Sequence, residues 1–174
     1  LIPRPPLQQS PSAFLPDAAP LLEEEGNPLA QALVADVEDP LLARAAVALV
    51  VVPDPDALLL IRRAERPGDP WSGQMGLPGG RSSPADAGLL ETAIRETREE
   101  VGISLLREEL VGPLDDVAPR SPHLPPLMVR PFLFVLSRRP IVIPNSEVAE
   151  HVWVEWDALA HPESYRPHTI RLGQ

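Results

Sequence analysis

Three glutamates near the middle of the chain are spaced so that a single helix would bring them together. Glu96, Glu99 and Glu100 stand at positions i, i+3 and i+4, so at about 100° per residue they occupy one narrow arc of a helix. Carboxylates this close raise one another's pKa unless a cation lies among them. Hard divalent cations such as Mg²⁺ bind oxygen ligands of this kind, often together with substrate phosphates. The spacing therefore indicates a metal site, although a solvated helix face with Glu–Arg pairs would show the same pattern.

The helix that would carry these glutamates falls in a proline-free stretch. The chain has 24 prolines, but none lies between Pro84 and Pro113, and proline breaks helix interiors. We therefore expect a helix over residues 86–101, with Gly102 as its C-cap. Its core-facing stripe recurs at helical spacing and consists of Leu90, Ile94, Thr97 and Val101.

Short apolar runs on both sides of this helix predict strands. The expected strands cover residues 45–52, 58–61, 110–114, 127–136 and 152–156. Pro131 would place its strand at a sheet edge or at a bulge, because proline has no N–H to donate. With a further helix expected over residues 27–37, the pattern predicts one mixed α/β domain over residues 26–174. A proline-rich arm over residues 1–25 would precede it.

The composition excludes several classes of function. The chain carries 25 acidic and 15 basic residues, a formal net charge of −10, which disfavours binding to nucleic acid or to an anionic membrane. It has no Lys and no Cys, so Schiff-base chemistry, disulfides and thiolate catalysis are excluded. No apolar run is long enough to span a membrane, and residues 1–12 lack the apolar centre of a secretory signal. The sequence thus favours the cytoplasm and leaves the oligomeric state open, a homodimer included.

A glycine turn lies upstream of the three glutamates. It reads Leu77-Pro78-Gly79-Gly80, and its glycines permit close approach of the backbone to a ligand or metal. Together with this turn, the chain resembles the second half of the Nudix hydrolase signature through Arg95, Glu96, Glu99, Glu100, Gly102 and Ile103. The resemblance covers about residues 45–159 and implies a Nudix-type α/β/α sandwich with a mixed β-sheet. It also implies hydrolysis of a small-molecule substrate, a nucleoside diphosphate linked to another moiety.

The resemblance assigns roles to residues by position. It implies Mg²⁺ or Mn²⁺ as the cofactor, with Glu96, Glu99 and Glu100 as metal ligands and the Gly80 carbonyl as a further one. Glu99 and Glu100 are thereby implied in catalysis. Glu147, from a loop near the C-terminus, is a third catalytic candidate. The general base stays open between Glu100 and Glu147.

The first half of the signature departs from the family pattern at Asp86. The glutamate expected there is an aspartate, and eight residues instead of seven separate it from Arg95. We interpret Asp86 as a charge that stabilises the positive end of the helix.

One subgroup of the family shares two further stretches with this chain. The runs Leu59-Leu60-Ile61-Arg62-Arg63-Ala64 and Gly73-Gln74-Met75-Gly76-Leu77-Pro78-Gly79-Gly80 resemble the coenzyme A pyrophosphatases. In this chain Leu77 replaces the phenylalanine of that subgroup, and Asp69 stands where the subgroup has an arginine. This resemblance implies hydrolysis of coenzyme A or acyl-CoA to 3′,5′-ADP and (acyl-)4′-phosphopantetheine. The alternatives are hydrolysis of ADP-ribose, NADH, a dinucleoside polyphosphate or a damaged nucleotide, and a non-catalytic nucleotide-binding domain.

The candidate substrate-binding residues are four arginines and two ring side chains. They are Arg62, Arg63, Arg66, Arg81, Trp71 and His123. Arginine forks suit phosphate groups, and an indole can stack on a base. Surface positions for the arginines and for His123, and packing under a proline-rich loop for Trp71, are the alternatives.

Overall fold

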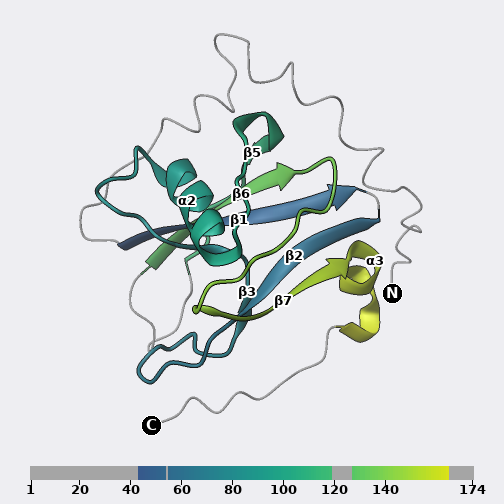
Figure 1. Ribbon diagram of the computed structural model, residues 1–174, viewed down its shortest axis with the longest axis horizontal. Coiled ribbons are helices and arrows are strands. Elements are labelled where there is room, and N and C mark those ends of the chain that lie inside the picture. Colours follow the sequence, from purple (N-terminus) through teal and green to yellow (C-terminus); the bar gives the residue numbers. More distant parts are fainter. Residues whose placement is uncertain (1–42, 54, 119–126, 165–174) are drawn as a thin grey trace, which may run out of the picture.

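A mixed β-sheet of seven strands is the framework of the protein in this computed structural model, which describes residues 43–53, 55–118 and 127–164 (Figure 1). The strand order is β3-β2-β1-β6-β5, with β4 pairing to β1 and β7 pairing to β2. The strands are β1 (Ala43–Pro53), β2 (Asp56–Arg63), β3 (Met75–Gly76), β4 (Gly79–Arg81), β5 (Leu110–Pro113), β6 (Leu127–Val135) and β7 (Val148–Glu155). The predicted arm over residues 1–25 and the helix predicted over residues 27–37 lie outside the described residues.

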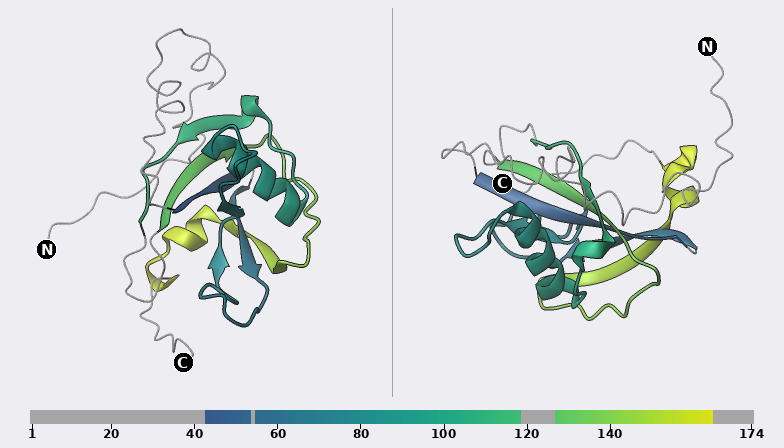
Figure 2. Two further views of the ribbon diagram at one scale, coloured as in Figure 1. Left: turned by 90° about the vertical axis from the view of Figure 1, so that its left-hand side faces the viewer. Right: turned by 90° about the horizontal axis from the view of Figure 1, so that it is seen from above.

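Helices occupy a small share of the described residues. They are α2 (Leu89–Val101), α3 (Trp156–Ala160) and the 3-10 turns η3 (Arg107–Glu109) and η4 (Pro162–Ser164). Figure 2 shows α2 against one face of the sheet and α3 beyond the end of β7. Within the described part of the chain, no helix is both long enough and apolar enough to cross a membrane.

The central strand β1 changes its partner along its length. Its first half pairs antiparallel with β4, where Ala45 faces Arg81, and its second half pairs antiparallel with β2, where Val51 faces Leu58. On its other side β1 pairs parallel with β6 from Ala43 to Val51. The glycine turn therefore lies directly beside the first half of β1, and the Pro78 carbonyl accepts a 2.8 Å hydrogen bond from the Ala48 N–H.

The five predicted strands and the predicted core stripe are present. Leu90, Thr97 and Val101 are buried, and Ile94 packs partly buried against the same core. Gly102 is the C-cap, with φ of 71° and its N–H donated to the Arg98 carbonyl. The very short strands β3 and β4 have no apolar run of their own, so the sequence did not reveal them.

Of the two positions predicted for Pro131, a sheet edge or a bulge, the edge is wrong, whereas the pairing of β5 with β6 does contain a register irregularity between Leu110 and Gly112. Strand β6 lies between β1 and β5, so the edge strand on this side is β5. The sheet accommodates the proline because β5 has already ended at Pro113. Beyond that point the Pro131 carbonyl accepts the Leu114 N–H, and the next pairing is the isolated bridge between Val117 and Val129.

Candidate active site

A cavity of about 580 Å³ lies beside the glycine turn, between the first half of β1 and the loop that joins β2 to β3. Its apolar side is formed by alternate residues of β1 and β6, namely Ala45, Val47, Leu127 and Val129. Its polar side is formed by the turn, by α2 and by two loops, and includes Arg63, Asp69, Gly79, Gly80, Arg81, Glu96, Glu100 and Glu147. Segments far apart in the sequence thus meet at one hollow that has an apolar wall and an acidic wall.

Glu100 is the buried acid of this cavity. Its side chain is only 3% exposed, and its Oε2 accepts a 2.9 Å hydrogen bond from the Gly79 N–H. Burial raises the pKa of Glu100 to about 7, and the charges of Glu96 and Glu147 act in the same direction. The Gly79 N–H and the Arg63 guanidinium, whose Nη1 lies 3.9 Å from Oε1, oppose that rise. Glu100 can therefore exchange a proton near neutral pH.

The two glycines of the turn have close neighbours of different kinds, backbone at Gly79 and a side chain at Gly80. A side chain on Gly79, whose φ is 153°, would collide with the Ala46 carbonyl and with Val47 of β1. A Cβ on Gly80 would lie 2.5 Å from the Glu96 carboxyl carbon. The Gly80 backbone and the Glu96 carboxylate are therefore immediate neighbours at the cavity wall.

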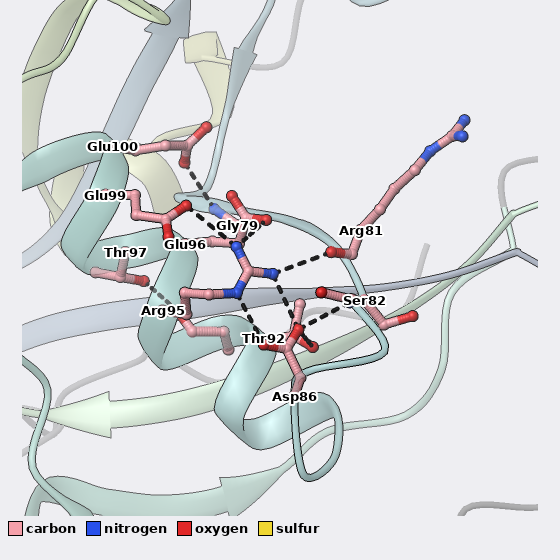
Figure 3. Close-up of polar contacts among 12 residues, drawn as sticks. Gly79, Arg81, Ser82, Asp86, Thr92, Arg95, Glu96, Thr97, Glu99 and Glu100 are labelled. Atoms are coloured by element: carbon pink, nitrogen blue, oxygen red, sulfur yellow. Dashed lines mark hydrogen bonds and ion pairs between the residues drawn. The ribbon is translucent and has the colours of Figure 1, made fainter.

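Arg95 is bonded to both Glu96 and Glu99 of the same helix (Figure 3). Its Nη1 donates to Glu96 Oε1 at 2.8 Å and to Glu99 Oε2 at 3.1 Å. Glu99 is 55% exposed and lines a separate groove along the outside of α2, whereas Glu96 and Glu100 line the cavity. The three glutamates predicted to bind the metal thus share one helix, but Glu96 and Glu100 face the cavity whereas Glu99 faces the outer groove.

The donor chemistry of the cavity fits a hard divalent cation. Glu96, Glu100, Glu147 and the Gly80 backbone offer oxygen atoms only, the donors that Mg²⁺ and Mn²⁺ take. Among residues 43–53, 55–118 and 127–164, no three acidic or histidine side chains converge closely enough to coordinate one ion as they stand. Two of the predicted ligands, Glu96 and Glu99, are instead paired with the Arg95 guanidinium.

Asp86 lies three residues ahead of α2, and its carboxylate accepts hydrogen bonds from two side chains of that helix, Thr92 and Arg95. Its Oδ1 accepts from Arg95 Nε at 2.8 Å and its Oδ2 from Arg95 Nη2 at 2.9 Å. Oδ2 also accepts the Ser83 N–H and the Thr92 hydroxyl. The Arg95 guanidinium holds the pKa of Asp86 well below its ordinary value. Asp86 is therefore the residue that orients Arg95.

Three of the four predicted phosphate-binding arginines are paired with carboxylates. Arg62 forms a two-armed, exposed ion pair with Glu150 and does not line the cavity. Arg63 lines the cavity and pairs with Asp69 at 3.0 Å. Arg66 does not line the cavity but pairs at 3.3 Å with Glu147, which does.

The remaining predicted residues differ in their relation to the cavity. Arg81 lines it, with a side chain that extends away from Gly79 and the glutamates (Figure 3). Trp71 lines it from the β2–β3 loop, and His123 lies outside the described residues. Sequence reasoning did not single out Asp69 as a site residue or the apolar wall as part of the site. The alternation of small residues in β1 was the available signal for that wall.

Comparison with known proteins identifies relatives over the same region. Residues 42–172 match the NUDIX domain family model. An uncharacterized protein of Schizosaccharomyces pombe is 40% identical over 111 residues, covering 61% of this chain and 34% of that protein. Mitochondrial coenzyme A diphosphatase NUDT8 of Homo sapiens is 38% identical over 109 residues, covering 60% of this chain and 45% of the human protein. The chain thus spans less than half the length of these two relatives.

A solved structure shares the fold. The Ap4A hydrolase of C. elegans, in a binary complex, superposes with a TM-score of 0.54 at 21% identity, covering 68% of this chain and 83% of that one. The predicted α/β class and mixed sheet are confirmed. With the family model matching most of its length, the chain belongs to the NUDIX domain family.

Proposed function

We propose that the protein is a metal-dependent hydrolase of the diphosphate bond in a nucleoside diphosphate derivative. The observation that carries this proposal is the meeting of Glu96, Glu100 and Glu147 with the Gly79–Gly80 turn at one cavity. Family membership supports the same class of reaction. The non-catalytic alternative is disfavoured because Glu96, Glu99 and Glu100, the motif carboxylates that such domains usually lose, are all retained.

The metal site is proposed to consist of Glu96, Glu99, Glu100 and the Gly80 carbonyl. A bound Mg²⁺ or Mn²⁺ would neutralise the charge of the diphosphate and lower the pKa of a water molecule. Glu99 can join this set only when its carboxylate leaves Arg95, to which it is now bonded. Arg95 thus supplies the positive charge that keeps the acidic side chains ordered before a metal binds.

Two acids on the cavity wall are suited to accept a proton from the attacking water. The first is Glu100, whose pKa burial raises to about 7 while no metal is bound. The second is Glu147, which lines the same cavity and forms a 3.3 Å ion pair with Arg66. We assign proton transfer to this pair of acids.

Coenzyme A or acyl-CoA is the substrate we propose within this class. The support is the 38% identity to a protein named coenzyme A diphosphatase, together with the two sequence stretches shared with that subgroup. ADP-ribose, NADH, dinucleoside polyphosphates and damaged nucleotides are the alternatives. The cytoplasmic location and a homodimer stay predictions, and the name of the human relative places that relative in mitochondria.

The test is a panel of these compounds incubated with the protein and Mg²⁺ or Mn²⁺. We expect release of 3′,5′-ADP from coenzyme A, abolished by EDTA and by Glu99→Gln and Glu100→Gln. Glu150→Gln, which alters an exposed acid outside the cavity, is the matched control and should retain full activity. Turnover of ADP-ribose without coenzyme A would overturn the substrate assignment, and full activity of both glutamine variants would overturn the metal assignment.

A further inference from the structure

The connection between β6 and β7 is attached to the end of helix α2 that carries Glu100. The Val101 carbonyl accepts the Ile143 N–H at 2.9 Å, and the Glu100 carbonyl accepts the Asn145 N–H at 2.9 Å. Carbonyls in the last turn of a helix have no partner within that helix and need one from elsewhere. The connection supplies these partners, so the backbone of Asn145 is fixed beside the backbone of the buried acid.

The Asn145 side chain links this anchor to Glu147. Its Oδ1 accepts the Glu147 N–H at 2.7 Å, and the Asn145 carbonyl accepts the Val148 N–H at 3.3 Å. An asparagine that bonds the backbone two residues further on forms an Asx turn, which fixes the course of the chain. The Glu147 carbonyl in turn accepts the Ala64 N–H at 2.7 Å, directly after β2. Both backbone polar groups of Glu147 are thus bonded, one to Asn145 and the other to Ala64.

The carboxylate of Glu147 has a weaker attachment of its own. Its 3.3 Å ion pair with Arg66 joins two side chains that are 44% and 46% exposed, respectively. Such exposed pairs contribute little, because solvent screens the charges and both long side chains lose rotational freedom. The place of the Glu147 carboxylate at the cavity therefore depends mainly on how its backbone is held, and hence on Asn145.

We propose that Asn145 is a positioning residue that holds Glu147 in place relative to Glu100 for proton transfer. The inference rests on the proposed function and deepens it. Asn145 does not itself line the cavity, so it acts on the reaction only through the backbone of Glu147. A misplaced proton acceptor slows the chemical step, whereas the binding of substrate and metal does not depend on that acceptor.

Replacement of Asn145 tests this role in steady-state kinetics with coenzyme A and Mn²⁺. Asn145→Ala removes the acceptor of the Glu147 N–H, and we expect kcat to fall by about tenfold while KM and Mn²⁺ affinity stay within about twofold. Asn145→Asp retains an oxygen in the same place and should restore kcat to within about threefold of the wild type. Ser146→Ala changes an exposed neighbour in the same turn and is the matched control, with kcat unchanged.

A double-mutant cycle separates positioning from a general loss of folding. In the Glu147→Gln background, Asn145→Ala should lower kcat by less than about twofold further, because the acceptor that Asn145 positions is already absent. A folding defect lowers kcat by the same factor in both backgrounds. Equal losses in both backgrounds, unchanged kcat in Asn145→Ala, or no recovery in Asn145→Asp overturns the inference.

Failure of the proposed function gives a different result. Full kcat in Glu147→Gln refutes its role in proton transfer and this inference together, whereas metal-dependent turnover still supports the hydrolase. If another compound of the panel is hydrolysed instead of coenzyme A, the cycle is run with that compound. If none is hydrolysed, the proposed function fails, and hydrogen exchange at the Glu147 amide still tests Asn145. Exchange should be faster in Asn145→Ala and slow again in Asn145→Asp, and equal rates in all three proteins overturn the inference.

Discussion

The Asp86 carboxylate accepts two hydrogen bonds, of 2.8 and 2.9 Å, from the Arg95 guanidinium, although an extra residue separates the two compared with the family signature. The loop ahead of α2 absorbs that residue, because the helix begins only at Leu89. Arg95 is thereby oriented so that its remaining nitrogen reaches Glu96 and Glu99. Replacing Asp86, which does not line the cavity, should therefore change how Arg95 holds Glu96 and Glu99, and with it the binding of a metal.

Replacement of Asp86 tests this relationship. In Asp86→Asn the guanidinium loses its anchor and pairs more strongly with Glu96 and Glu99, so it competes with the metal. We expect the free energy of unfolding to fall by about 2 kcal/mol, and Mn²⁺ to bind about tenfold more weakly in a calorimetric titration. Asp115→Asn, at an exposed loop position, is the control and should change neither quantity. Unaltered Mn²⁺ affinity in Asp86→Asn would show that Arg95 does not act on the metal ligands.

The stability of the metal-free protein should depend on pH through Glu100. Its pKa is about 7 in the folded chain against an ordinary 4.5, so the folded state binds the proton more tightly than the unfolded state. The stability that Glu100 contributes is therefore greatest below about pH 4.5. It is lost as the pH rises through 7, by about 3 kcal/mol at most. Urea unfolding in EDTA between pH 5 and pH 8 measures the effect.

Two variants separate Glu100 from other groups that titrate in that range. Glu100→Gln should flatten the pH dependence, whereas Glu108→Gln, at an exposed position, should preserve it. Saturating Mn²⁺ should stabilise the wild type more at pH 8 than at pH 5, because the metal competes with the proton for the carboxylate. A wild-type profile that stays flat without metal would contradict the assignment.

The two glycines of the turn should respond differently to alanine. Gly79→Ala places a methyl group against the β1 backbone at a positive φ, so it should destabilise the fold by about 2 kcal/mol or more. Gly80→Ala meets the movable Glu96 carboxylate instead. It should lower Mn²⁺ affinity with less effect on thermal unfolding. Similar losses of stability in both variants would contradict the view that Gly79 is needed for the fold and Gly80 for the metal site.

Glu147 should act in the chemical step more than in binding. We expect Glu147→Gln to lower kcat by about 10²-fold, with KM and Mn²⁺ affinity changed little, because it removes a proton acceptor at the cavity wall. Arg66→Gln removes only the ion pair that holds Glu147 and should reduce kcat less than threefold. Steady-state kinetics over pH 6–9 check both. If Glu147→Gln keeps full kcat, proton transfer falls to Glu100 alone.

The sequence by itself determined the main elements and the family. Apolar runs predicted five strands, and a proline-free stretch with a 3.6-residue stripe predicted α2, because these patterns depend only on local spacing. Arg95, Glu96, Glu99 and Glu100 with the glycine turn were sufficient to indicate a Nudix hydrolase. The family match confirmed that resemblance.

Only the tertiary structure decided how these residues face one another. Spacing placed Glu99 with Glu96 and Glu100, but in the structure Glu99 is 55% exposed and lines a groove on the outside of α2. Arg62 and Arg63 are neighbours in sequence, yet alternation along β2 sends them to different carboxylates, Glu150 and Asp69. The pKa of Glu100 likewise follows from burial by segments distant in the chain. The Arg62–Glu150 pair and the desolvation of Glu100 are set by long-range packing, which local sequence spacing does not encode.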